Sequence, residues 1–127
     1  MSVVDTSVWV AVLRGSKGSP ATTLNGLLDA DEVALALPVR LELLAGVARS
    51  ERSVLKRALA ALPVVAPGES TWDLVERWIA RAADAGHRFA LTDLLIGALA
   101  EELGALVWSL DADFDRMAAL RLVRLYE

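Results

Sequence analysis

The sequence predicts an α/β protein of three layers (α/β/α), in which helices cover both faces of a mostly parallel central sheet of about five strands. Short apolar runs alternate with longer segments whose apolar residues recur every three or four positions, which is the order strand, helix, strand, helix. The run Val33–Leu37 (VALAL) is apolar throughout, as is typical of a parallel strand buried on both faces. A chain of 127 residues can bury a core of its own, so we expect residues 1–127 to form a single domain.

The first third of the chain contains a strand and two helices before the VALAL run. Ser2–Val4 is a short apolar strand, and Ser7–Leu13 is predicted to be a helix that the next glycine stops. Ser19 followed by Pro20 is typical of an N-cap with proline in the first helical position, which predicts a helix to about Ala30.

Two helices and an edge strand are predicted for the middle of the chain. Pro38 ends the VALAL run and starts a helix that extends to about Arg49. Ser50 is the predicted N-cap of a helix over Glu51–Leu62. Val64–Ala66 is a candidate edge strand, because a Pro-Gly turn follows it at once.

The last third contains two predicted helices and two predicted strands. Ser70 with Asp73 resembles a capping box, which predicts a helix to about Ala85. Thr92 is the predicted cap of a helix that ends before Gly104. The strands are expected at Leu106–Leu110 and Leu122–Tyr126.

The composition excludes several classes of protein. There is no cysteine, which removes disulfide frameworks and thiolate zinc sites, and the single histidine, His87, argues against histidine-rich metal sites. The net charge of −4 is not that of a protein that holds nucleic acid by bulk positive charge. No apolar run has the length of a bilayer span and no signal peptide is evident, so we expect a soluble cytoplasmic protein without a membrane partner.

Four acidic residues stand at comparable places in the predicted order of elements. Asp5 and Asp111 each follow a predicted strand directly. Asp93 lies in the first turn of one predicted helix, and Glu42 lies in the first turns of another. The carboxyl ends of parallel strands share an edge of the sheet with the helix starts, so the four carboxylates can converge there.

Three of the four acids also have a structural explanation. Asp5 can cap the helix that follows it, and Asp93 can stabilise a helix dipole, which contributes about 0.3–1 kcal/mol. Glu42 can pair with a nearby arginine such as Arg40. The helix around Glu42 is apolar nearly all round, so we expect its carboxylate not to be freely solvated.

Converging carboxylates would need a cation. Two carboxylates about 4 Å apart repel by roughly 4 kcal/mol at an effective dielectric constant of 20. Ligands that are all oxygen suit Mg²⁺ or Mn²⁺, which can activate water for in-line attack on a phosphodiester. Ser7 and Ser109 would then orient the acids. A Ser-His-Asp triad on His87 is formally open, but no nucleophile-elbow glycine pattern accompanies it.

Four motifs in order resemble the PIN domain family, and more narrowly its VapC-type ribonuclease toxins of bacterial and archaeal toxin–antitoxin pairs. They are DTSVWV at the start, then RLELLAGV, LTDLLIGALA and SLDADF, and together they cover nearly the whole chain. The resemblance implies a PIN-like fold and a Mg²⁺- or Mn²⁺-dependent endoribonuclease.

The resemblance also implies roles for the matched residues. The expected catalytic residues are Asp5, Glu42, Asp93 and Asp111, with the metal held by Asp5, Asp93 and Asp111. Asp113 belongs to the family's D-F pair and can replace or assist Asp111, while Ser7 and Ser109 are supporting residues. Pro38 stands where a small hydroxyl residue often precedes the glutamate helix, and Ser109 stands where threonine is usual. Both departures affect the fine geometry of the site.

The partners that the resemblance implies are RNA, a second copy of the chain, and a cognate antitoxin that covers or enters the acidic site. The candidates for RNA contact are Arg14, Lys17, His87 and Arg88. We expect Val39–Leu62 to form part of the antitoxin groove.

Two other functions remain as alternatives. The first is a PIN-fold module that binds RNA or protein without cleavage, against which the presence of all four acids argues. The second is another Mg²⁺-dependent phosphoryl-transfer enzyme. A haloacid-dehalogenase-like phosphatase would require an aspartate where Ser7 stands. A response-regulator receiver would require a lysine beyond the last core strands, whereas the lysines of this chain are Lys17 and Lys56.

Overall fold

The computed structural model describes residues 1–15 and 18–127 of the chain. Within them the sheet has four strands in the order β3-β2-β1-β4, and all neighbouring strands are parallel. Their bounds are β1 Ser2–Val4, β2 Val33–Ala36, β3 Val64–Val65 and β4 Leu106–Trp108. Ser2 of β1 pairs with both β2 and β4, and this central position explains why every residue of β1 is buried.

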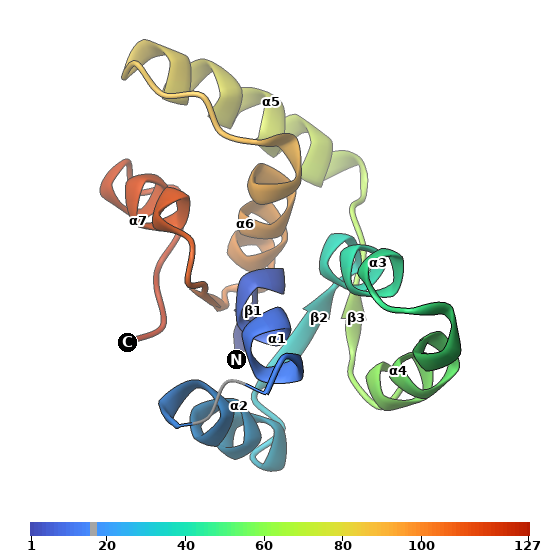
Figure 1. Ribbon diagram of the computed structural model, residues 1–127. Helices are drawn as coiled ribbons and strands as arrows, with labels where there is room; N and C mark the ends of the chain where they lie inside the picture. The colour runs from blue at the N-terminus through green and yellow to red at the C-terminus, as the bar shows by residue number, and fades with distance from the viewer. Residues whose placement is uncertain (16–17) are drawn as a thin grey trace.

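Helices surround the sheet in the described part of the chain (Figure 1). They are α1 Thr6–Leu13, α2 Ser19–Asp29, α3 Leu37–Gly46, the 3₁₀-helix η1 Arg49–Glu51, α4 Arg52–Leu59, α5 Glu69–Asp84, α6 Leu91–Leu103 and α7 Ala112–Ala119. In Figure 1, α6 lies between α5 and the sheet, and it packs against β1, β2 and β4. None of the helices in residues 1–15 and 18–127 is long and apolar enough to cross a membrane.

Helix α6 is buried along most of its length, and Gly97 is its point of closest packing. A Cβ atom at Gly97 would lie 2.8 Å from Met117 Cε, 2.9 Å from Val123 Cγ1 and 3.1 Å from Trp78 Cζ3. A side chain at this position would therefore overlap its neighbours, because packed carbon atoms lie about 3.5–4.0 Å apart. The contact fixes the helix whose first turn carries Asp93.

The predicted fold class is confirmed, since the chain forms a parallel sheet flanked by helices. The described sheet nevertheless has four strands, one fewer than the expected number. The predicted strand Leu122–Tyr126 forms only an isolated parallel bridge between Leu125 and Val107. Two backbone hydrogen bonds hold this bridge, in which Val107 N–H donates to Arg124 O and Tyr126 N–H donates to Val107 O.

Four predicted helix caps were wrong. Ser19, Ser50, Ser70 and Thr92 all lie inside helices and not at their N-caps. The Ser70 hydroxyl donates to Glu102 on α6, so it ties α5 to α6 and does not cap α5. Gly68 is the N-cap of α5, where its N–H donates to Thr71 Oγ1.

Helix α7 was not predicted, although the sequence contains its signals. Asp111 is the N-cap and accepts a hydrogen bond from Asp113 N–H at 2.9 Å. Phe114 and Met117 are buried, and their spacing of three residues places them on one face of the helix. The α7 helix is thereby anchored next to the acids at its start.

Candidate active site

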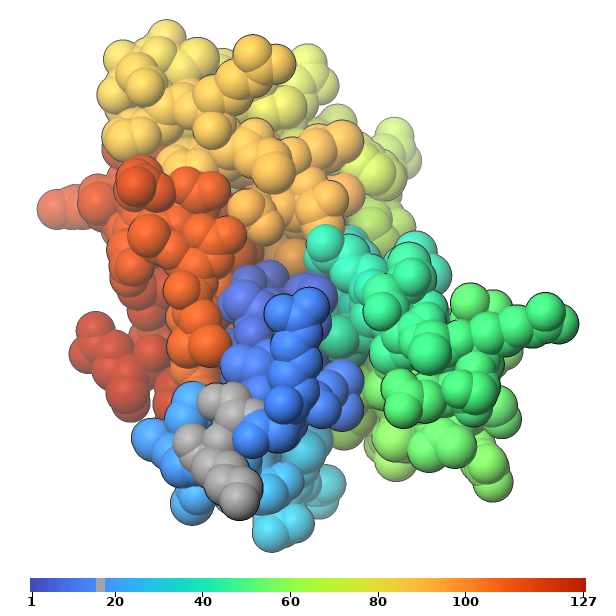
Figure 2. All heavy atoms as spheres, in the orientation of Figure 1, coloured from blue at the N-terminus to red at the C-terminus, as the bar shows by residue number. Residues whose placement is uncertain are grey.

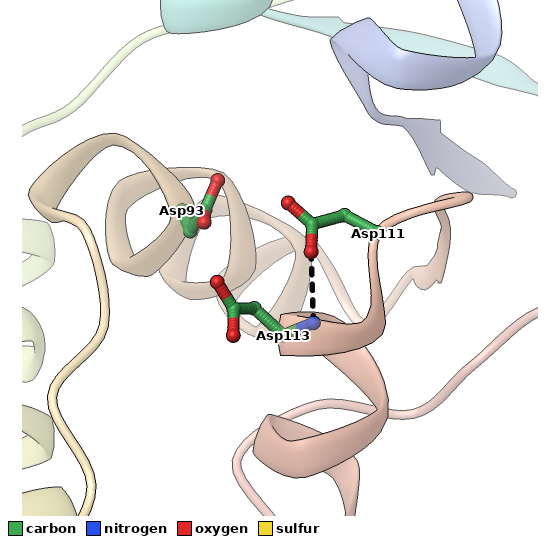
Figure 3. A group of neighbouring side chains, drawn as sticks. All are labelled: Asp93, Asp111 and Asp113. Carbon is green, nitrogen blue, oxygen red and sulfur yellow. Dashed lines mark hydrogen bonds between the residues drawn. The ribbon is translucent and has the colours of Figure 1, made fainter.

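Three aspartates meet at the carboxyl end of the sheet. Asp93 lies in the first turn of α6, Asp111 follows β4, and Asp113 lies in the first turn of α7. One carboxylate oxygen of each lies within 4.8 Å of those of the other two, and Figure 3 shows the three side chains converging. We had expected Asp5, Asp93 and Asp111 as metal ligands, so this group contains Asp113 in place of Asp5.

Asp5 lies at the end of β1, and only 5% of its surface is exposed. Its Oδ2 accepts hydrogen bonds from Ser7 Oγ and Ser109 Oγ, both at 2.7 Å. Ser7 N–H also donates to Oδ2 at 3.4 Å, so Asp5 is the N-cap of α1. No described residue donates to Oδ1, which leaves this oxygen free for a ligand. Capping and ligand binding are therefore compatible at Asp5.

The two serines connect Asp5 to the start of α7. Ser7 Oγ accepts a hydrogen bond from Leu110 N–H, and Ser109 Oγ accepts one from Asp111 N–H, both at 3.0 Å. Each hydroxyl therefore donates to the Asp5 carboxylate and accepts from the backbone that follows β4. This network fixes the position of Asp111 relative to Asp5, although 104 residues separate Asp5 from Ser109.

The acids influence one another electrostatically. Burial raises the pKa of Asp93 to about 6, and the negative charges of four other acids add to the effect. In decreasing order of contribution they are Asp5, Asp111, Asp113 and Glu42. All the predicted catalytic acids thus lie close enough to Asp93 to oppose its ionisation.

Glu42 differs from our expectation, because its side chain is exposed. Helix α3 buries Val39 and Leu43 but leaves Leu41 56% exposed, so the helix is not covered on all sides. No ion pair joins Glu42 to Arg40 within the described residues. Instead, Thr6 Oγ1 donates a hydrogen bond of 2.8 Å to Glu42 Oε1, a contact that the sequence analysis missed.

Few cations accompany these acids in the described residues. Arg116 pairs with Asp113 at 2.7 Å, three residues apart on α7. Arg14 lines a groove between α1 and α3. His87 and Arg88 line a different hollow, beside α5 and the start of α6. Lys17, another predicted RNA contact, lies outside the described residues.

The residues fit a hard divalent cation. Every candidate ligand is a carboxylate, as Mg²⁺ and Mn²⁺ prefer. Carboxylate charges about 5 Å apart repel by roughly 3 kcal/mol at an effective dielectric constant of 20. Burial is the largest cause of the raised pKa of Asp93, and this repulsion adds to it; a cation would relieve the repulsion. Asp93, Asp111 and Asp113 are the residues best placed to hold such an ion, and Asp5 is near enough for its charge to act on Asp93.

Replacement of Ser109 by alanine should test the serine network. The buried Asp5 carboxylate would lose one hydroxyl donor, and Asp111 N–H would lose its acceptor. We expect the free energy of unfolding, measured in urea, to fall by about 2 kcal/mol. Ser109→Thr keeps the hydroxyl and should retain most of the stability. Equal losses in the two variants would show that the hydroxyl does not carry the effect.

Comparisons with known proteins agree with this arrangement. A model of the PIN domain family matches residues 2–120. Ribonuclease VapC18 of Mycobacterium tuberculosis is 32% identical over 122 residues, which are 92% of this chain and 87% of that protein. Its likeness therefore extends through nearly all of the elements described above.

Solved structures share the fold. The crystal structure of VapBC2 from Rickettsia felis, bound to a DNA fragment from its promoter, aligns with a TM-score of 0.81 and 19% identity, over 98% of this chain and 96% of that chain. VapBC-5 from Mycobacterium tuberculosis, a member of the VapBC family of toxin-antitoxin systems, has a TM-score of 0.71 and 22% identity, over 99% and 97% of the chains.

Proposed function

Because this chain belongs to the PIN domain family, we propose that it is a Mg²⁺- or Mn²⁺-dependent endoribonuclease, the toxin of a toxin–antitoxin pair that cuts cytoplasmic RNA. The observation that carries the proposal is the meeting of Asp93, Asp111 and Asp113 at the carboxyl end of a parallel sheet. The ribonuclease name of the Mycobacterium relative and the toxin–antitoxin description of VapBC-5 support it.

The acidic residues would have two different roles in the reaction, binding of the ion and acceptance of a proton. Asp93, Asp111 and Asp113 would hold the ion, and Asp5 would offer its Oδ1. When bound, the ion supplies neutralisation of phosphodiester charge and activation of water. Glu42 is exposed and keeps one carboxylate oxygen free of the Thr6 hydrogen bond, so it can accept a proton from the attacking water. No protein nucleophile is needed.

RNA cleavage tests this proposal. The purified chain is incubated with structured RNA and Mn²⁺, with and without EDTA, beside the variants Asp111→Asn and Asp115→Asn. We expect cleavage that EDTA abolishes, that Asp111→Asn reduces by at least about a hundredfold and that Asp115→Asn retains. Asp115 is the matched control, because it lies in α7, the helix that Asp111 caps, but outside the three-aspartate group. Cleavage that Asp111→Asn leaves unchanged would contradict the proposal.

We place the antitoxin on the groove between α1 and the α3–η1 segment, which overlaps our expectation for Val39–Leu62. Val10, Leu13, Leu43 and Val47 supply its apolar lining, and Glu42 and Glu51 supply acidic groups. Leu13 is 55% exposed. In Figure 2, α3 and α4 form a lobe beside α1, so the groove is accessible from this face. An amphipathic segment with a basic side chain would complement this surface and could reach Glu42.

Leu13→Asp should weaken the binding of the cognate antitoxin at least about tenfold, because it places a charge where apolar surface would be buried. Calorimetric titration measures the dissociation constant, and RNA cleavage should stay within about twofold of the parent. Leu103→Asp is the control, since Leu103 is also exposed but lies at the far end of α6. Unchanged antitoxin affinity in Leu13→Asp would exclude this groove.

A second copy of the chain is the other protein partner that we propose. Leu41, Trp72, Ile79 and Leu91 on α3, α5 and α6 are each at least 50% exposed. Leu41 and Trp72 line one open hollow, and contiguous exposed apolar surface of this kind is typical of a face that is covered in an assembly. Light scattering should give twice the 13.6 kDa mass of the chain. A monomer at the same concentration would refute the dimer.

A further inference from the structure

We propose that Thr6 is a positioning residue, whose hydroxyl holds the Glu42 carboxylate for the reaction; this inference rests on the proposed ribonuclease function. Thr6 Oγ1 donates to Glu42 Oε1 at 2.8 Å, and the two residues are 36 positions apart in the sequence. The bond therefore joins the start of α1 to α3, two elements that also pack against each other.

Glu42 requires such a tether because it is exposed. An exposed glutamate on a helix samples several rotamers, and restricting them costs conformational entropy. The other acids are held more firmly: Asp5 is buried and accepts two serine hydroxyls, and Asp111 caps α7. Within the described residues, Thr6 is the group that holds Glu42 by a hydrogen bond, and no ion pair replaces it.

Thr6 is itself rigidly placed. It is the first residue of α1, and the preceding Asp5 O accepts the N–H groups of Val8 and Trp9. The hydroxyl of Thr6 is not needed to start the helix, because Asp5 provides the capping carboxylate. Two consecutive residues thus contribute to the site in different ways. Asp5 supplies its own carboxylate, and Thr6 positions the carboxylate of Glu42.

The Thr6–Glu42 bond leaves Glu42 Oε2 free to accept a proton. Glu42 contributes to the raised pKa of Asp93, though less than the other three acids, so it stands at the margin of the acidic group. A carboxylate at the margin can act on a water molecule or phosphate without occupying the place of the ion. Loss of the tether should therefore reduce the rate of the chemical step more than it weakens RNA binding.

The test uses four variants of the full chain: Thr6→Val, Thr6→Ser, Glu42→Ala, and Thr6→Val combined with Glu42→Ala. Valine matches the shape of threonine but cannot donate, whereas serine retains the donor. The readouts are kcat and KM for RNA cleavage with Mn²⁺, the dissociation constant for Mn²⁺ by calorimetry, and the urea midpoint of the metal-free chain. The last two do not depend on cleavage.

We expect Thr6→Val to lower kcat about tenfold with KM within about twofold, which corresponds to loss of one hydrogen bond to a charged acceptor. Thr6→Ser should recover most of the rate. In the Glu42→Ala background, Thr6→Val should produce no further loss of rate and no shift of the urea midpoint beyond that of Glu42→Ala alone. Such a result would show that the effects of the Thr6 and Glu42 substitutions are coupled through the hydrogen bond between these two side chains.

Independent losses in the double variant would overturn the assignment, as would a Thr6→Ser variant that is as slow as Thr6→Val. If the parent chain cuts no RNA, the proposed function fails and the midpoint cycle still decides the assignment. A midpoint shift from Thr6→Val that vanishes in the Glu42→Ala background supports the tether. A shift of equal size in both backgrounds, or no shift in either, overturns it.

Discussion

Asp93→Asn is expected to abolish the activity and yet to stabilise the metal-free chain. The substitution removes one carboxylate of the three-aspartate group that we propose as the metal centre, so we expect cleavage to fall on the order of 10³-fold or more. It also removes the carboxylate that burial and four neighbouring acids oppose. Activity and stability should therefore change in opposite directions.

The sign of the stability change depends on pH. The pKa of Asp93 is about 6 in the folded chain and 3.8 as the ordinary value, so the folded state binds more protons between these values. The stability of the metal-free parent is therefore highest, with respect to this group, below about pH 4, and decreases as pH rises through 6. Asparagine stays neutral, so its advantage should be absent at pH 4 and on the order of 1 kcal/mol at pH 7, after allowance for solvent screening.

Urea unfolding at pH 4 and pH 7 in EDTA measures the stability difference, and RNA cleavage with Mn²⁺ measures the activity. Asp73→Asn is the matched control, because Asp73 is exposed, lies within α5 away from the C-terminal end of that helix, and should change neither quantity. The account fails if Asp93→Asn retains cleavage. It also fails if the substitution destabilises the metal-free chain at pH 7, since burial and the neighbouring acids would then not oppose the charge of Asp93.

Gly97→Val should produce the largest loss of stability among the substitutions considered. Its side chain would collide with Met117, Val123 and Trp78, of which only the Met117 methyl lies at the end of a flexible chain. Overpacking of this kind costs about 1–3 kcal/mol or more, and we expect a value near 3 kcal/mol. The melting temperature should fall by about 10 °C.

Gly26→Ala provides the control for the helical position. A Cβ at Gly26, in α2, meets nothing within 4 Å, so alanine should stabilise the chain by about 0.5–1 kcal/mol. Thermal unfolding in the absence of metal compares the two variants. A Gly97→Val chain as stable as the parent would show that α6 can move away from its neighbours, and that Asp93 is held less firmly than the packing implies.

The arrangement of acids was largely predictable from the sequence. Asp5 and Asp111 follow apolar runs, and parallel pairing of β1 with β4 necessarily places the ends of these strands side by side. Asp93 could be assigned to a helix start in the same way. The membership of the tight group was not predictable, because Asp113 enters it only through α7, a helix that the sequence analysis missed.

The exposure of Glu42 shows a second limit. The sequence of α3 contains many apolar residues, which predicted a helix covered on all sides. Only Val39 and Leu43 are buried, because α3 packs against its neighbours on one side and leaves Leu41 exposed. The apolar content of α3 therefore did not predict how much of the helix is buried, because some of its apolar side chains remain on the surface. Similarly, Ser70 was predicted to cap a helix, but its hydroxyl makes a contact between two helices by donating to Glu102.

A crystal of the chain soaked with Mn²⁺ tests the central claim most directly, because anomalous diffraction locates the ion without reference to activity. The account predicts one peak between Asp93, Asp111 and Asp113, with carboxylate oxygens about 2.0–2.3 Å away. The peak should be absent in an Asp111→Asn crystal soaked in the same way. A peak bound elsewhere, or none in the parent at saturating Mn²⁺, would contradict the assignment of these aspartates as the metal centre.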